Sequence, residues 1–339
     1  MTRARRELIA LESTAYYHCI SRCVRRAFLC GEDSLTGNNY EHRKTWVTDR
    51  LRELAAVFSI DICAYAVMSN HYHLVLRIDR VKADAWSQQT VVKHWAKLFK
   101  PPLLVSNYQN GITQSDAEIR AAEELIAQWR DRLTDISWFM RCLNEHLARR
   151  ANEEDRCRGR FWEGRFKSQA LLDEAAVLTC MSYVDLNPIR AGIAATPESA
   201  DFTSIQQRIR EYGKSQRKSK TPKTAKPRIP LMPLVGPGKD GHENAIGFRL
   251  NDYLELVDWA GRAVREDKRG AIPSDIPPIL HRLGLAPDRY LEHLSGHGQL
   301  EDPVVLGPAD QIKRMARKVG RCFFKGQSEA RRLYRVLPV

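Results

Sequence analysis

Two short apolar runs separated by a two-residue polar break place the strongest constraint on the fold. Residues 60–68, IDICAYAVM, are apolar at alternating positions on both sides, as in a strand with both faces buried. After Ser69 and Asn70, residues 71–79, HYHLVLRID, resume the β-like pattern. So short a break between two β segments predicts an antiparallel hairpin inside a buried sheet.

The segments around this hairpin predict an α+β fold. Strands are expected at 15–23 and 159–172, and helices at 42–59, 136–153 and 174–187. The resulting order of strand, helix, strand, strand, helices, strand and helix is a βαββαβ-like pattern. It predicts a ferredoxin/RRM-like antiparallel sheet with helices on one face.

Composition divides the chain into further segments. Residues 84–135 are expected to be a helical insertion in a first domain spanning 10–205, with Ser115 and Glu118 as a capping box. Residues 206–229 are expected to be a basic linker, since the stretch 208–228 holds nine Lys and Arg against one Glu. Residues 230–339 are expected to form a mainly helical, basic C-terminal unit, to which the sequence assigns no function.

Charge and cysteine use narrow the class of protein. The formal net charge of +13 favours a polyanionic partner such as nucleic acid, although an ordinary basic protein also fits. No apolar run is long enough to span a bilayer, and no apolar stretch follows the basic first ten residues, so neither membrane insertion nor secretion is expected. The eight cysteines include no CxxC pair and indicate reduced thiols of a cytoplasmic protein; a metal at Cys19, Cys23 and Cys30 is the less favoured alternative.

The second strand of the hairpin carries a candidate metal site. His71 and His73 are two residues apart and therefore project from the same face of a strand. Paired imidazoles suit a divalent metal ion. The alternative is a pair of hydrogen-bonded or exposed histidines without a ligand.

The helix expected at 174–187 carries two more candidates. Tyr183 and Asn187 are four residues apart and share the apolar side of this helix, which must face the sheet. Taken alone, they fit a core tyrosine and an asparagine that ends the helix before Pro188. Taken with the histidines, the carboxamide completes a three-ligand metal site with a tyrosine hydroxyl one turn away.

The stretch GRFWEGRFK, 159–167, interleaves basic and aromatic residues. Its cations are expected to bind phosphates, and Phe161, Trp162 and Phe166 are expected to stack on unpaired bases. For Trp162 or Phe166, a place in the core of the strand is an equal alternative. The candidate DNA-binding residues are Arg160, Phe161, Trp162, Arg165, Phe166 and Lys167.

Two motifs, MSNHYHLVL (68–76) and YVDLNPIRAG (183–192), together with the intervening GRFWEGRFKS, resemble the HUH single-tyrosine transposases, including the REP-associated tyrosine transposases. The resemblance covers roughly residues 10–205 and implies an HUH endonuclease core. It implies that His71, His73 and Asn187 hold Mg²⁺ or Mn²⁺, and that Tyr183 is the nucleophile forming a 5′-phosphotyrosine. Asn187 stands where some relatives have Gln, and the smallest members lack the linker and the C-terminal unit.

The resemblance implies a bacterial, cytoplasmic, nucleoid-associated transposase that cuts and rejoins single-stranded DNA at hairpins or repeats. It favours a monomer over a homodimer. An HUH nickase of the replication-initiator type is an alternative, disfavoured because no GxxxxGK[ST] helicase motif is present. The other alternative is a domesticated, non-catalytic nucleic-acid-binding regulator.

Overall fold

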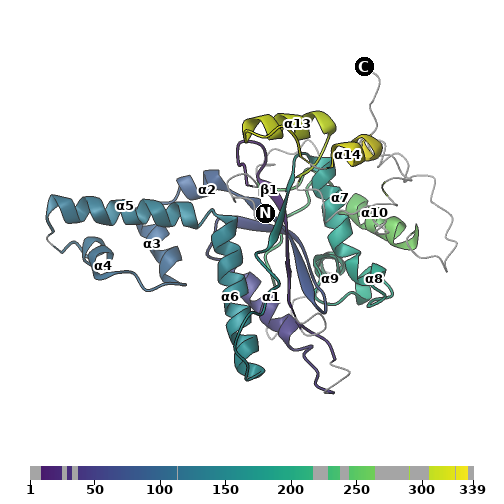
Figure 1. Ribbon diagram of the computed structural model, residues 1–339, viewed down its shortest axis with the longest axis horizontal. Helices are drawn as coiled ribbons and strands as arrows, with labels where there is room; N and C mark the ends of the chain where they lie inside the picture. Colours follow the sequence, from purple (N-terminus) through teal and green to yellow (C-terminus); the bar gives the residue numbers. More distant parts are fainter. Residues whose placement is uncertain are drawn as a thin grey trace.

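A five-stranded sheet organises the residues that the computed structural model describes, which are 9–24, 29–32, 37–112, 114–216, 228–236, 244–263, 290, 305–324 and 326–334 (Figure 1). The strands are β1 (Tyr16–Arg22), β2 (Ile60–Val67), β3 (His71–Ile78), β4 (Lys167–Leu171) and β5 (Val305–Leu306). The helices before β4 are α1 (Arg43–Ala55), α2 (Arg80–Asp84), α3 (Gln88–Ala96), α4 (Leu103–Gln109), α5 (Asp116–Arg132) and α6 (Ile136–Glu154). Those after it are α7 (Glu174–Asp185), α8 (Asn187–Arg190), η2 (Pro197–Ser199), α9 (Ser204–Gln216), α10 (Leu250–Ala263), α13 (Ala309–Lys318) and α14 (Gln327–Leu333).

The strand order is β2-β3-β1-β4-β5. The predicted hairpin is confirmed, because β2 and β3 pair in antiparallel fashion up to Val67 and Tyr72. The antiparallel strand β3 lies between β1 and β2, which is the split arrangement expected of a βαββαβ chain. The sheet is nevertheless mixed and not wholly antiparallel as predicted, since β5 joins β4 in parallel. This short strand comes from the C-terminal segment and covers the edge of β4.

Helices cover both faces of the sheet, and the prediction of helices on one face is wrong. Neighbouring residues of β3 point to opposite sides: the Tyr72 hydroxyl donates to Asn144 of α6, whereas His73 contacts Asn187 of α8. In Figure 1, α1 and α6 lie on one side of the sheet, and α7, α9 and α10 lie on the other. The physical reason is the apolar character of β2 and β3 on both alternating faces, which requires cover on both sides.

Helix α7 lies between the sheet and α10 and is buried from Ala175 through Asp185. Its first turn is capped by the Asp173 side chain, which accepts a hydrogen bond from the Ala176 backbone N–H at 2.7 Å. At its other end the buried Asp185 carboxylate accepts hydrogen bonds from the Ser204 hydroxyl, the Ile205 N–H at 3.0 Å and the Tyr253 hydroxyl at 2.6 Å. The C-terminal segment thus holds the end of α7 in place.

The first part of the segment expected to be a linker is helical. Helix α9 extends to Gln216, and the Arg208 guanidinium, which is 5% exposed, donates to the carbonyls of Cys63 and Met232 at 2.9 Å each. A basic residue here satisfies buried backbone acceptors, which composition alone does not reveal. Residues 217–227 lie outside the described residues. The division into 10–205, 206–229 and 230–339 stays a prediction, and the described helices of the last range share the hydrophobic core of the first.

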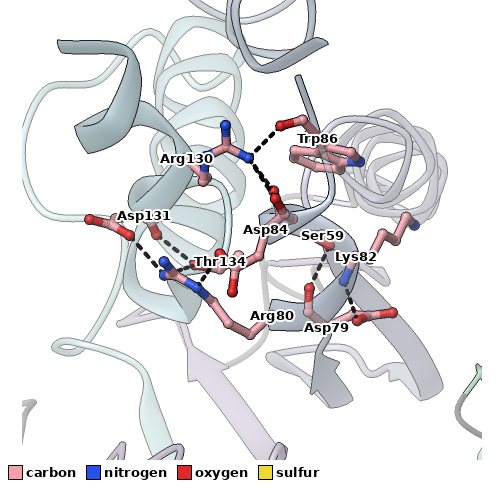
Figure 2. A network of polar contacts seen from close by, with 10 residues as sticks. Ser59, Asp79, Arg80, Lys82, Asp84, Trp86, Arg130, Asp131 and Thr134 are labelled. Carbon is pink, nitrogen blue, oxygen red and sulfur yellow. Dashed lines mark hydrogen bonds and ion pairs between the residues drawn. The ribbon is translucent and has the colours of Figure 1, made fainter. Parts of the chain in front are cut away.

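The expected insertion forms an arm of α3, α4 and α5 that projects away from the sheet (Figure 1). The predicted capping box of Ser115 and Glu118 is confirmed at the start of α5. Figure 2 shows the contacts at the base of the arm. The Arg130 side chain on α5 donates hydrogen bonds to the backbone carbonyl of Ala83, in α2, and to that of Trp86, just after α2, the latter at 2.6 Å. These contacts join the last part of α5 to the turn that follows α2.

The hydrogen bond from the Tyr253 hydroxyl to Asp185, which joins α10 to α7 and is called the brace below, can be tested by mutation. We expect Tyr253→Phe to lower the free energy of unfolding by about 1–3 kcal/mol, because a buried carboxylate oxygen loses its donor. Urea denaturation followed by circular dichroism measures the change. The matched control is Tyr108→Phe on the arm, whose hydroxyl bonds Gln88 and Glu123 near the surface and should change stability by less than about 0.5 kcal/mol. Equal effects of the two substitutions would contradict a special role for the brace.

Candidate functional site

The structure brings together four residues that the sequence singled out, His71, His73, Tyr183 and Asn187. The Asn187 carboxamide nitrogen lies 3.1 Å from Nε2 of His73. The ring centroids of His71 and His73 are 4.8 Å apart, and the Tyr183 ring meets that of His73 edge-on at 5.8 Å. His73 is fully buried, Asn187 is 8% exposed and Tyr183 is 5% exposed.

A break between two helices keeps Tyr183 and Asn187 on one side. Helix α7 ends at Asp185, the backbone stays helical at Leu186, and the one-turn helix α8 begins at Asn187. Pro188 has no N–H and is tolerated at the start of α8. The four-residue spacing therefore survives the break, and both side chains face β3.

His18 and Gln169 also belong to this site, and the sequence did not single them out. Nε2 of His18, on β1, lies 3.0 Å from Nδ1 of His73, and Nδ1 of His18 lies 3.4 Å from the Gln169 carbonyl oxygen on β4. A carbonyl only accepts hydrogen bonds, so His18 donates through Nδ1 and accepts through Nε2 from His73. This leaves Nε2 of His73 with a lone pair directed at Asn187. The three residues lie on three different strands, so this series of hydrogen bonds can be recognised only once the pairing of the strands is known.

Burial lowers the pKa of His73 well below its ordinary value, and electrostatic interactions with His71, His18, Arg190 and Arg22 lower it further. The imidazole of His73 is therefore neutral, which is the form that binds a metal ion. His71 is partly buried, and its Nδ1 bonds the side-chain oxygen of Asn70 at the hairpin turn.

Arg190 is a further residue that the sequence did not assign to the site. Its guanidinium carbon lies 4.5 Å from the centre of the Tyr183 ring. Nε and Nη1 are shielded from solvent and have no hydrogen-bond acceptor among the residues that the structure describes. The sequence could have indicated it, because Arg190 stands three residues after Asn187 and this spacing puts both side chains on one face of α8.

Two of the predicted phosphate-binding residues lie near the histidines. Arg165 and Lys167 line a cavity of about 260 Å³ together with Ile20, Arg22 and Glu163. In the sheet, Arg22 is paired with His71, and Ile20 with His73. Paired residues project from the same face, so the cavity and the histidines share one face of the sheet. Arg160, the third predicted cation, is exposed and does not line the cavity.

The predicted aromatic residues lie in or against the core. Phe161 is 2% exposed and Phe166 is 8% exposed. For Phe166 this is the core alternative that the sequence left open, whereas Phe161 was expected to stack on bases. The Trp162 indole N–H donates to the Asn144 carbonyl at 2.9 Å, and its ring meets Tyr72 edge-on. Of the strand predicted at 159–172, only Lys167–Leu171 forms a regular strand, β4. Before it, Trp162 makes an isolated β-bridge to Cys23.

Within the described part of the chain, no group of three His, Cys, Asp or Glu side chains is arranged to hold a metal ion. Cys19, Cys23 and Cys30, the less favoured metal site, are buried and form no disulfide with the described residues. A metal at His71 and His73 would therefore require the Asn187 carboxamide as its third protein ligand. In the same described residues, no helix has the length and apolar character needed to cross a membrane.

Comparison with known proteins gives one distant similarity. No protein-family model matches the chain, and no curated protein matches it. A solved structure of a REP-associated tyrosine transposase bound to a REP hairpin is similar to it with a TM-score of 0.37 and 12% sequence identity. The similarity covers 62% of this chain and 87% of the transposase chain.

The protonation state of His73 gives a prediction. A histidine with its ordinary pKa, about 6.5, gains a proton as the pH falls through that value. His73 should remain neutral over that range, because burial lowers its pKa in the folded protein, whereas in the urea-unfolded protein its ring should gain a proton. Nitrogen-15 chemical shifts of the His73 ring, assigned with a His73→Gln variant, measure this in both states. A His73 resonance of the folded protein that titrates near the ordinary pKa would contradict the prediction.

Proposed function

We propose that this protein cuts and rejoins single-stranded DNA through Tyr183, as a metal-dependent strand transferase of the HUH single-tyrosine type. The observation that carries the proposal is the contact of the Asn187 carboxamide with Nε2 of His73, one helical turn from the phenol of Tyr183. A core tyrosine and a helix-ending asparagine have no need of two neighbouring imidazoles. The distant similarity in fold is not needed for this reasoning.

The residues present fit a divalent cation. The hydrogen-bond chain from Gln169 through His18 leaves an unprotonated nitrogen on His73, and the His71 ring and the Asn187 carboxamide are next to it. We propose that His71, His73 and Asn187 hold Mg²⁺ or Mn²⁺, and imidazole ligands favour Mn²⁺ more than an all-oxygen set does. When bound, such an ion supplies positive charge to the non-bridging oxygens of a phosphodiester.

The proposed reaction conserves the number of phosphoester bonds. The Tyr183 oxygen attacks phosphorus, an O–P bond forms, and the bond from phosphorus to the 3′-oxygen breaks. The phenol proton passes to water, and the departing 3′-oxygen takes up a proton from water, so no co-reactant is consumed. The products are a 5′-phosphotyrosine and a free 3′-hydroxyl. Attack of a 3′-hydroxyl on the phosphotyrosine reverses the step and joins strands.

We propose that the DNA strand lies in the cavity on the same face of the sheet as the histidines. Arg22, Arg165 and Lys167 surround the cavity on the same face as the histidines. Contacts of this kind bind the phosphate backbone and position a strand without reading its sequence. We propose single-stranded DNA beside a hairpin as the substrate, because a hairpin leaves an unpaired strand end whose backbone such a cavity accepts.

The first test is Tyr183→Phe, which removes only the hydroxyl. The substrate is a pool of oligonucleotides, each with a hairpin and a random single-stranded flank, incubated with Mn²⁺. The wild type should give a protein–DNA adduct that survives denaturing electrophoresis. The variant should lose at least about a thousandfold in adduct yield, since a nucleophile is removed.

Tyr108→Phe on the arm is the control for this test and should form adduct as the wild type does. Binding of the hairpin pool by Tyr183→Phe, measured by fluorescence anisotropy, should stay close to that of the wild type. An adduct formed by Tyr183→Phe would exclude Tyr183 as the nucleophile, and no adduct from the wild type would overturn the proposed function.

The second test addresses the metal. EDTA should stop adduct formation, and His71→Ala or His73→Ala should reduce it more than Asn187→Ala, because water replaces an amide ligand more readily. His18→Phe should weaken Mn²⁺ binding by about 10- to 100-fold in calorimetric titration, since a partner that orients a ligand is lost. His94→Phe, where the ring stacks on Trp86 in the arm, is the matched control. Full activity in EDTA would overturn the metal assignment.

A further inference from the structure

Arg190 has a set of contacts that a purely structural arginine does not need. Its guanidinium packs over the Tyr183 ring, where a cation over an aromatic face gains a modest attraction. Nε and Nη1 are covered, and neither finds a hydrogen-bond acceptor among the described residues. A buried donor left unpaired lowers stability, and more so when it is charged. The position therefore lowers the stability of the protein unless an anion occupies it.

The place of Arg190 on the helix identifies where such an anion would lie. Tyr183, Asn187 and Arg190 are at positions i, i+4 and i+7 along α7 and α8 and form one stripe. That stripe faces β3, because Asn187 contacts His73 and the Tyr183 ring meets the His73 ring. The phenol, the carboxamide and the guanidinium are thus neighbours on the side that faces the histidines.

The electrostatics of the site also favour an anion. The guanidinium of Arg190 lies over the Tyr183 ring, and Arg22 is paired with His71 in the sheet. The side chains proposed as metal ligands, two histidines and one asparagine, include no carboxylate that would balance these two cations. A site in which positive charge predominates attracts negative ligands.

We propose that Arg190 binds a non-bridging oxygen of the phosphodiester that Tyr183 attacks. The planar fork of a guanidinium matches the spacing of phosphate oxygens, and its Nε and terminal nitrogens donate side by side. The stack on Tyr183 holds the fork beside the phenol, so the phosphate it binds is the one within reach of the nucleophile. This inference rests on the proposed function and adds a substrate-binding residue outside the metal ligands.

A thermodynamic cycle between one side chain and one phosphate tests the inference. The cut position is first mapped by sequencing the DNA in the wild-type adduct. Oligonucleotides are then made with either the normal phosphodiester or a neutral methylphosphonate at that position. Their dissociation constants are measured with proteins carrying Tyr183→Phe, which bind without cutting, and with either Arg190 or Arg190→Gln.

We expect each single change to weaken binding by about 10- to 100-fold, the range for a hydrogen bond between charged groups. Made together, the two changes should weaken binding no more than either does alone, because they remove the same contact. Arg190→Lys keeps the positive charge but not the planar guanidinium, so it should keep only part of the energetic coupling between residue 190 and the phosphate. It also serves as the test variant if Arg190→Gln does not fold. Urea denaturation establishes that each variant is folded.

The matched control is Arg149→Gln on α6, where an exposed arginine pairs with Glu145. It removes the same charge and should show no coupling to the methylphosphonate. Losses that simply add for Arg190→Gln and the methylphosphonate would overturn this inference and leave the proposed function standing. No adduct from the wild type would overturn the proposed function and this inference with it.

Discussion

The contact between the carboxamide of Asn187 and Nε2 of His73 is the interaction on which the arrangement of the site depends. It joins α8, which directly follows the helix that carries Tyr183, to the central part of the sheet. Both partners are buried, so the contact exists only because α7 packs directly on β2 and β3. On the other side of His73, the chain through His18 to Gln169 fixes the ring from within the sheet. A series of hydrogen bonds from Asn187 through His73 and His18 to Gln169 therefore crosses an otherwise apolar interface, and the packed core around it limits how far these side chains move.

The position of α7 depends in turn on residues much later in the chain. Burial raises the pKa of Asp185 to about 6, while hydrogen bonds from Ser204, Tyr253 and the Ile205 N–H act in the opposite direction. A carboxyl group in the core is tolerated because these donors surround it. One of them, Tyr253, belongs to α10, and β5 lies against β4 at the edge of the sheet. The C-terminal segment thus helps to hold α7, and with it Tyr183, in place.

The hairpin was predictable from the two-residue break between its strands. The shared faces of His71 and His73, and of Tyr183 and Asn187, were predictable because each follows from a period of two or of about four residues along continuous strand or helical backbone. The chain of His18 and Gln169 was not, because it depends on which strands pair. The cover of the second face and the addition of β5 depend on contacts between distant segments. Phe161 and Phe166 show the same limit: an aromatic residue in a basic stretch suits stacking on bases and core packing equally well, and only the packed structure distinguishes them.

The balance of charge at the site constrains what it binds. A buried imidazole held neutral, a second imidazole and a carboxamide bring no negative charge. A guanidinium is stacked on the phenol, and the cavity on the same face of the sheet is lined by three cations and only one carboxylate, Glu163. Metal sites that serve structure alone usually carry anionic ligands that offset the metal charge. Here a divalent cation would add to the positive charge already present. Such a site gains most from a ligand with several anionic oxygens, and a nucleic-acid backbone presents them at regular intervals. The neutrality of the protein ligands is thus a reason to look for the missing negative charge in the substrate.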